Sequence, residues 1–384
     1  MRFEFATDSR IVFGPGSLAQ AGAIARAWGR RAFVVTGRDP GRARHLATLL
    51  GEAGVAAEVF PVAGEPTVGA VASALAAARE GRAELVIGFG GGGAIDAAKA
   101  VAGLLANPGD PLDYLEVVGR GAPLANPALP WMAVPTTAGT GAEVTKNAVL
   151  GVPERGVKVS LRSPQLLARV ALVDPELTIG LPPGPTAASG MDALAQLIEA
   201  YVCCRSNPMT DALCAEGLPR FARAFPAVWR DPGDIGARTD VALASLLSGL
   251  ALANAGLGAV HGFAAPLGGL FSAPHGEVCA ALLGPVMAAN LSALGEGGDP
   301  GGALGRYAEL ARWLTGRADA QASDGVAWVR GWVETLGIRR LSAHGLTRER
   351  IGEVVARAKA ASSMKANPVV LSDGALSAIL AESL

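Results

Sequence analysis

One carboxylate and one amide stand four residues apart in a stretch that is otherwise nearly all apolar, GMDALAQLIEA at residues 190–200. Residues at positions i and i+4 lie on the same face of a helix, so Asp192 and Gln196 point the same way. Polar groups that face the inside of a protein need polar partners, because leaving them unpaired is costly. The pair therefore predicts a polar site where this helix packs.

Four consecutive glycines, Gly90 to Gly93, lie between an apolar run and a helical segment that carries Asp96 and Lys99. In such a turn the backbone N–H groups can approach a pyrophosphate, with the positive end of the helix dipole behind them. The spacing is not the GxGxxG fingerprint, and a tight turn that needs glycine is the alternative. Four glycines in a row favour close approach by a ligand.

A second polar loop, PTTAGTGAEVT at 135–145, also follows a predicted strand. Thr136, Thr137 and Thr140 offer hydroxyls suited to phosphate or ribose oxygens, although such loops often only cap helices. Ligands of open α/β sheets bind outside the carboxyl ends of the strands. Both loops are therefore predicted to line one nucleotide site.

The elements that must position these residues change character along the chain. Apolar runs predict strands at 31–37, 56–62, 83–90, 130–137 and 170–175 and a hairpin at 148–161, and helical patterns fall at 43–54 and 68–80. Later apolar stretches have helical spacing, at 187–203, 209–228, 236–256, 276–294, 302–315, 322–336 and 347–361. We therefore predict an α/β Rossmann-like dinucleotide-binding domain over residues 1–180 and an all-α domain over residues 181–384.

The composition excludes several classes of function. The 384 residues carry a formal net charge of −1, which gives no electrostatic reason to expect nucleic acid as a partner. No uncharged apolar run reaches the roughly 18 residues that a membrane span needs. The four cysteines lack a CxxC spacing, and a disulfide framework is not expected in a chain of this length. We expect a cytoplasmic protein with a small-molecule substrate.

At its two polar loops the sequence resembles the iron-containing (group III) alcohol dehydrogenase family. The resemblance extends over the whole chain through FGPGSL, GGGGAIDAAKA, PTTAGTGAEVT, GMDALAQLIEAYV, VHGFAAPLGG, PHGEVCA and SSMKANPV. It implies the dehydroquinate synthase-like fold of that family, with a divalent metal and a nicotinamide cofactor in the cleft between two domains. It also implies the interconversion of a small alcohol with its aldehyde or ketone, and a homodimer.

The resemblance also assigns cofactor contacts position by position. The residues that match the family's pyrophosphate and dinucleotide contacts are Gly91, Gly92, Gly93, Asp96, Thr136, Thr137, Thr140, Lys158 and Leu177. Gly93 stands where the family usually has serine. NAD-selective members have an acidic residue after the first strand, whereas this chain has Gly37 followed by Arg38. A guanidinium recognises phosphate, so NADP(H) is expected in preference to NAD(H), unless Gly37 is only a turn and Arg38 a solvated charge.

The family's metal ligands are an aspartate, a histidine four residues later, and two further histidines, which fall here on Asp192, Gln196, His261 and His275. Three of these positions match, and Gln196 departs from the pattern. Either the other three hold Fe²⁺ or Zn²⁺, with the amide as a weaker ligand or behind the site, or no metal binds. We expect metal binding, since two imidazoles and a carboxylate already make a three-ligand site with an open position.

A second departure is Ala265, where many relatives have a histidine suited to relaying the alcohol proton. Three other functions stay open. One is a metal-independent, maleylacetate reductase-like reductase, and another is a dehydroquinate synthase-like lyase, which the scarcity of lysine in the second half disfavours. The third is a nucleotide-binding protein without catalysis. The expected function is that of an NAD(P)-dependent alcohol dehydrogenase, with Asp192, His261 and His275 as its catalytic residues.

Overall fold

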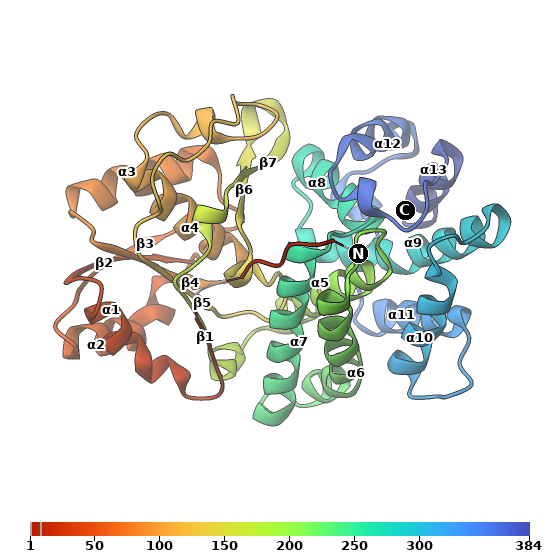
Figure 1. Cartoon of the computed structure of the whole chain (residues 1–384), viewed down its shortest axis with the longest axis horizontal. Helices are drawn as coiled ribbons and strands as arrows, with labels where there is room; N and C mark the ends of the chain where they lie inside the picture. Colours follow the sequence, from red (N-terminus) through yellow and green to blue (C-terminus); the bar gives the residue numbers. More distant parts are fainter. Residues whose placement is uncertain (1, 8–9) are drawn as a thin grey trace. The chain divides into compact units, whose positions relative to one another are not determined.

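The computed structural model describes residues 2–7 and 10–384 of the chain. It divides the chain into two compact units, Ala6–Gly180 and Leu181–Leu384, and residues 2–5 group with the second unit. The first unit is an α/β structure, and in the second the described residues form helices and no strand (Figure 1).

A six-stranded, fully parallel sheet forms the centre of the α/β unit. Its strands, in spatial order, are β1 (Ile11–Phe13), β8 (Val170–Val173), β5 (Trp131–Pro135), β4 (Leu85–Gly90), β2 (Arg31–Thr36) and β3 (Ala56–Pro61). Every residue of β4 is buried, as expected for a parallel strand that is covered on both faces. A separate antiparallel hairpin joins β6 (Asn147–Val152) to β7 (Val157–Arg162).

Helices cover both faces of this sheet. On one face lie α1 (Ala21–Arg26) and α2 (Arg44–Glu52), and on the other α3 (Val68–Glu80) and α4 (Gly92–Ala106) (Figure 1). Successive side chains of a strand point to opposite faces, so Val34 enters one core while Phe33 and Val35 enter the other.

The chain order makes the carboxyl ends of β2 and β4 the switch point of the sheet. From β2 the chain first adds β3 on one side, then returns to add β4 and β5 on the other. The crevice outside such a point is where doubly wound sheets bind ligands. Gly37 follows β2, the glycine run begins at the end of β4, and the threonine loop follows β5.

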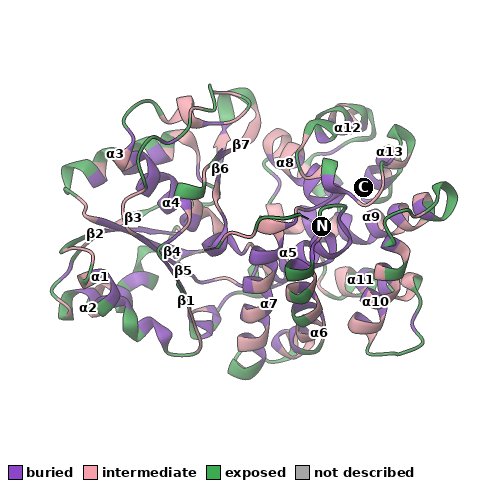
Figure 2. Cartoon of the chain, in the orientation of Figure 1, coloured by how far each residue is buried: buried purple, intermediate pink, exposed green. Residues whose placement is uncertain are grey.

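The helical unit is built around α5 (Pro183–Val202), in which all of residues 190–202 are buried (Figure 2). The helices that pack directly on it include α6 (Pro208–Arg230), α7 (Ile235–Asn254) and α9 (His275–Gly297). The remaining helices are α8 (Ala259–Phe271), α10 (Ala303–Thr315), α11 (Ala322–Thr335), α12 (Ile351–Ala360) and α13 (Asp373–Glu382).

Two helices of this unit, α7 and α9, are long and apolar enough to cross a membrane by length and composition. Of their most apolar windows, 67% and 56% respectively are buried inside the structure. Burial of this extent is typical of core helices, so their apolar character is explained by packing.

The predicted fold class is confirmed: the strands and the hairpin predicted in the first half are all present. Among the strands and α-helices, the sequence reasoning missed four elements, namely β1, α1, α8 and α13. Strand β1 has only three residues, and α8 contains Pro266 together with several glycines, so neither carries a strong local signal.

Candidate functional site

Three helices of the helical unit bring the predicted metal-binding residues together. Asp192 lies on α5, His261 in the first turn of α8, and His275 is the first residue of α9. Nε2 of His261 is 3.2 Å and Nε2 of His275 is 3.6 Å from Oδ1 of Asp192. Asp192 and His261 are buried, whereas the His275 side chain is 38% exposed, so the cluster opens to the surface of its unit on that side.

Cys279 belongs to the same cluster. It follows His275 by one turn of α9, and its sulfur lies 3.7 Å from Nε2 of His261 and 3.7 Å from Nε2 of His275. The ligand atoms of Asp192, His261, His275 and Cys279 all lie within 4.8 Å of one another. The sequence reasoning did not single out this cysteine, although its i, i+4 spacing from His275 repeats the spacing of Asp192 and Gln196.

A buried glutamate, Glu199, orients His261 from behind. Oε2 of Glu199 is 2.6 Å from Nδ1 of His261, and Oε1 accepts a hydrogen bond from the backbone N–H of Val260 at 2.7 Å. A carboxylate that accepts from Nδ1–H fixes that proton in place, so Nε2, which lies against Asp192, can release its own proton when a metal ion binds; this arrangement is common behind metal-binding histidines. Glu199 lies one turn after Gln196 on the helix face that carries Asp192 and Gln196. This spacing in the sequence could have identified Glu199 as a site residue.

The same glutamate helps to hold the start of α8 in place. Oδ1 of Asn367 accepts from the N–H of Ala259 at 3.1 Å, beside the bond from Val260 to Glu199. A Cβ at Gly258 would lie 2.8 Å from both acceptor side chains, so glycine is needed for their close approach. The N–H groups at the start of α8, which lack partners within the helix, are thus satisfied by tertiary contacts.

The predicted fourth ligand, Gln196, accepts a hydrogen bond from α7. Its carbonyl oxygen Oε1 accepts from the Ser248 hydroxyl of α7 at 2.7 Å, and both residues are buried. Ser248 is therefore one partner of this amide.

The side chains of the cluster shift one another's pKa values. Burial alone would raise the pKa of Asp192, but His275 and His261 outweigh it and hold this pKa below its ordinary value. Burial would lower the pKa of both imidazoles, whereas Cys279 and Asp192 raise it well above the ordinary value. Negative Asp192 therefore stabilises positive charge in the cluster, carried by protons on the imidazoles, and a ring nitrogen must release its proton before it can ligate a metal ion.

In the α/β unit, the glycine turn packs tightly against neighbouring loops. A Cβ at Gly92 would lie 2.7 Å from the Thr140 side chain, and one at Gly93 would lie 2.3 Å from the backbone oxygen of Gly64. The serine that is usual in the family at the position of Gly93 would meet that oxygen. The glycines thus allow the turn and the threonine loop to pack together, and within the described structure no side chain caps the start of α4.

Asp96 and Lys99 tie the surrounding loops to α4. The Lys99 ammonium is fully buried and donates to the backbone oxygens of Ala142 and Asn147 and to the hydroxyl of Thr145, at 2.7–2.8 Å. Asp96 accepts from the N–H of Val149 and lies 3.6 Å from the ammonium. Burial raises the pKa of Asp96 although Lys99 opposes this effect.

The remaining predicted cofactor residues lie around the same edge of the sheet. Lys158 pairs with Glu65, and the carbonyl of Leu177 accepts from the Arg42 guanidinium at 3.2 Å. Gly37 is partly exposed and Arg38 is exposed. A Cβ at Gly37 would meet no atom within 4 Å, and Gly37 does not have a positive φ angle. Neither packing nor backbone conformation therefore requires glycine at this position.

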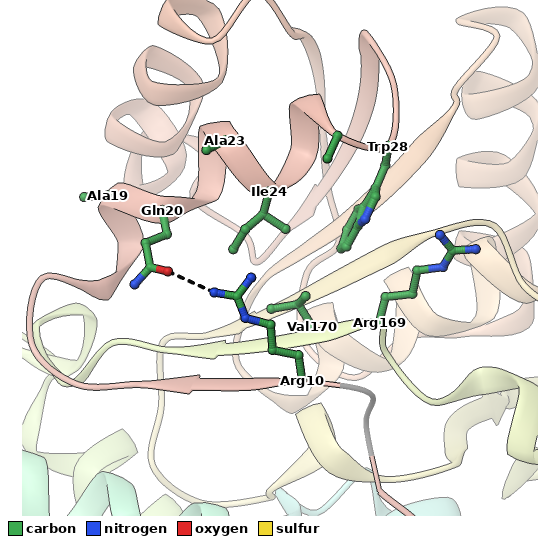
Figure 3. Close-up of a pocket in the computed structure, with 9 residues that line it drawn as sticks. Arg10, Ala19, Gln20, Ala23, Ile24, Trp28, Arg169 and Val170 are labelled. Carbon is green, nitrogen blue, oxygen red and sulfur yellow. Dashed lines mark hydrogen bonds between the residues drawn. The ribbon is translucent and has the colours of Figure 1, made fainter.

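A surface pocket of about 720 Å³ opens elsewhere in this unit (Figure 3). Arg10, Ile24, Trp28, Arg169 and Val170 are among its lining residues. Arg10 precedes β1 and Val170 begins β8, so the pocket lies at the amino ends of these strands. The glycine and threonine loops follow the carboxyl ends, and the pocket is therefore no part of their site.

Comparisons with known proteins agree with the geometry of both units. A family model described as iron-containing alcohol dehydrogenase matches residues 8–175, and a model of the C-terminal part of the Fe-containing alcohol dehydrogenase family matches residues 186–384. The probable alcohol dehydrogenase EutG of Salmonella typhimurium is 34% identical over 95% of this chain and 90% of its own length. The chain belongs to the iron-containing alcohol dehydrogenase family.

Two further relatives of this alcohol dehydrogenase agree with that assignment. Long-chain-alcohol dehydrogenase 1 of Geobacillus thermodenitrificans is 39% identical over 73% of each chain. A crystal structure of 1,3-propanediol oxidoreductase superposes with a TM-score of 0.91 at 30% identity and covers 100% of both chains.

The chain is therefore an NAD(P)-dependent alcohol dehydrogenase, an oxidoreductase that interconverts an alcohol and its aldehyde. Membership of the iron-type family implies a divalent metal and a nicotinamide cofactor. The three relatives named above are alcohol dehydrogenases or an alcohol oxidoreductase by name. They therefore do not favour the maleylacetate reductase-like, dehydroquinate synthase-like or non-catalytic alternatives.

Proposed function

We propose that this alcohol dehydrogenase binds one divalent ion on Asp192, His261 and His275, which act in catalysis at the substrate oxygen. The observation that carries the proposal is the convergence of these three side chains from α5, α8 and α9, with Glu199 bonded to the far nitrogen of His261. The partial exposure of His275 supports an open position for substrate. On this proposal the helical domain, residues 181–384, carries the metal and substrate site.

When bound, the ion would polarise the oxygen of the carbonyl or alkoxide, and the nicotinamide would give or take the hydride. The residues of the chain supply the rest. Asp192 provides negative charge beside the ion, and Glu199 keeps the proton of His261 on Nδ1 so that Nε2 stays free to ligate. Ala265, one turn after His261 on α8, has no titratable group, so the alcohol proton is not relayed through that side chain.

The metal proposal is tested by elemental analysis of the purified chain, paired with reductase activity before and after chelation and after addition of Fe²⁺ or Zn²⁺. We expect about one ion per chain and activity that falls on chelation and returns with the ion. Full activity in a chain that holds no metal and recruits none would contradict the proposal, and so would metal binding that survives loss of both histidines.

We further propose that residues 1–180 bind the nucleotide, with NADP(H) preferred over NAD(H). The contacts would come from Gly91, Gly92, Gly93, Asp96, Thr136, Thr137, Thr140, Lys158 and Leu177 around the pyrophosphate and nicotinamide ribose. Two facts support this location: these loops follow the carboxyl ends of neighbouring strands at the switch point, and the first turn of α4 has no side-chain cap. Asp96 supports the site from behind through its bond to the hairpin.

The preference for NADP(H) rests on Gly37 and Arg38 at the end of β2. Since neither packing nor backbone conformation requires Gly37, the missing carboxylate is best explained by the ligand. The nearby Asp39 does not replace it, because its side chain accepts from the N–H of Gly41 and caps a short turn. Arg38 and Arg42 then supply positive charge for a 2′-phosphate.

The ratio of kcat/KM for NADPH and NADH tests this preference. Hydrogen bonds to charged groups contribute roughly 1.5–3 kcal/mol, so Arg38→Ala should lower kcat/KM for NADPH by about 10- to 100-fold and leave NADH nearly unchanged. Gly37→Asp should move the preference toward NADH. A strong NADH preference in the wild type, unaffected by Gly37→Asp, would contradict the assignment.

We also propose a cytoplasmic homodimer. The four cysteines are all unpaired, which suits a reducing compartment. The short strand β1 is an edge of the sheet, and edge strands offer backbone groups to a second copy. Sedimentation equilibrium should give twice the chain mass, and Val12→Pro in β1 should shift it toward the monomer.

A further inference from the structure

We propose that Cys279 is the fourth protein ligand of the metal ion and replaces the imidazole that is missing at position 196. The inference rests on the proposed metal site and adds a thiolate to it. Its starting point is the position of the Cys279 sulfur, 3.7 Å from the ligand nitrogens of both His261 and His275. The side chain is fully buried on α9 and belongs to the only group of potential ligand side chains of this kind among the described residues.

The distances match four protein ligands around one ion, which would take the substrate oxygen as a fifth ligand. Bonds of about 2.3 Å to sulfur and about 2.0 Å to nitrogen or oxygen, at tetrahedral angles, place sulfur and nitrogen about 3.5 Å apart and nitrogen and oxygen about 3.3 Å apart. The sulfur to nitrogen distances here are 3.7 Å, and the nitrogen to oxygen distances are 3.2 and 3.6 Å. These four distances lie within about 0.3 Å of that geometry, and all pairs of ligand atoms are within 4.8 Å of one another.

The role of Gln196 agrees with this exchange. Its carbonyl oxygen already accepts from the buried Ser248 hydroxyl, which leaves at most one lone pair of that oxygen for a metal ion. An amide oxygen is also a weaker ligand than imidazole or thiolate for Fe²⁺ and Zn²⁺. Asp192, His261, His275 and Cys279 together offer four ligands from three helices, and Gln196 stays beside them bonded to Ser248.

A thiolate would change the chemistry of the site. On binding, the S–H bond breaks, a sulfur–metal bond forms and the proton leaves to solvent. Two negative ligands, carboxylate and thiolate, then balance the two charges of the ion. Sulfur ligands favour Zn²⁺ over Fe²⁺, so we expect Zn²⁺ to be the preferred ion. The competing explanation is that Cys279 is a neutral thiol that only fills space between the two imidazoles.

Cobalt(II) in place of the native ion separates the two explanations, because a thiolate ligand gives an intense near-ultraviolet charge-transfer band and a neutral thiol does not. The chain is stripped of metal and titrated with Co²⁺, with the absorbance and the bound metal measured together. Cys279→Ala should abolish the band and raise the Kd for Zn²⁺ by more than about 100-fold. Loss of a residue that only hydrogen-bonds to a metal ligand already lowers metal affinity by about 10- to 100-fold.

Cys214→Ala is the matched control, because Cys214 is an equally buried thiol on α6 outside the cluster, and it should keep both the band and the affinity. A chain whose Cys203, Cys204 and Cys214 are all alanine leaves Cys279 as its one thiol and should also keep the band. This variant tests the inference even if Cys279→Ala does not fold. Adding Gln196→His to Cys279→Ala should restore tight binding without the band.

Binding of one Co²⁺ per chain at the cluster without the band would overturn the thiolate ligand and leave the proposed three-residue metal site intact. The same holds if Cys279→Ala folds and binds Zn²⁺ as tightly as the wild type. Failure of the wild type to bind Co²⁺, Zn²⁺ or Fe²⁺ at all would overturn both this inference and the metal site of the proposed function.

Discussion

Replacement of Glu199 separates its two roles, the orientation of His261 and the capping of α8. Its carboxylate receives the N–H of Val260 at 2.7 Å, Nδ1 of His261 at 2.6 Å and, at 3.4 Å, the N–H of His261. Glu199→Ala leaves the two closely held donors buried without a partner, at roughly 1–3 kcal/mol each, so the free energy of unfolding should fall by about 4 kcal/mol. For a unit of this size that is a drop of about 8–16 °C in Tm.

Glu199→Gln keeps one neutral acceptor on the same stem. It should lower the free energy of unfolding by about 2 kcal/mol, half the loss in Glu199→Ala, because one of the two donors keeps an acceptor. The charge behind His261 is lost, so the affinity for Zn²⁺ should still fall by about 10- to 100-fold. Calorimetry gives the stability of both variants, and competition with a chelator gives their Kd for the metal.

Glu309→Gln is a suitable control for these variants. Glu309 accepts from the Tyr201 hydroxyl, which is also on α5, but it does not belong to the metal cluster. It should lose some stability and keep its affinity for metal. Glu199→Gln with the affinity of the wild type would refute the argument that this carboxylate orients a ligand, and Glu199→Ala with an unchanged Tm would refute the capping argument.

Three further predictions concern the α/β unit, each read from urea unfolding. Lys99→Met removes a buried ammonium beside Asp96 and should cost about 3–5 kcal/mol, and a loss under 1 kcal/mol would show that Lys99 does not hold the loops. Burial raises the pKa of Glu143 from 4.5 to about 7. The neutral carboxyl therefore makes its full contribution to the free energy of unfolding below pH 4.5, and this contribution is lost as the pH rises through 7. The excess stability of Glu143→Gln over the wild type should therefore grow by about 3 kcal/mol between pH 4.5 and 8, and a flat difference would contradict a raised pKa. Gly93→Ser, which puts a Cβ 2.3 Å from the backbone of Gly64, should cost about 1–3 kcal/mol, and a neutral result would mean that this loop moves freely.

Much of the fold follows from local pattern. Strands such as β4 are apolar throughout because helices cover both faces, and this produces the continuous apolar run seen at 83–90. Helix α8 could not be predicted in the same way, since Pro266 and three glycines weaken its intrinsic propensity. It forms because Glu199 and Asn367, both distant in sequence, accept its first N–H groups.

The candidate site was predictable only in part for the same reason. Resemblance to a family pattern identified Asp192, His261 and His275. Such a pattern gives no information at positions where this chain departs from it. From sequence alone, Cys279 is most simply interpreted as a buried apolar residue. Only the packing of α9 against α5 and α8 brings its sulfur close to both imidazoles. Spacing within one helix indicates which residues share a face, but not which residue of another helix they meet.

The capping of α8 by Asn367 has a consequence for synthesis on the ribosome. Ala259 and Asn367 are 108 residues apart, so the nascent chain exposes the start of this helix long before its acceptor is translated. The α/β unit precedes it in the chain and can fold first. The hydrogen bonds at the start of this helix are complete only after nearly all of the helical unit has been made, and metal loading at the cluster should therefore follow translation.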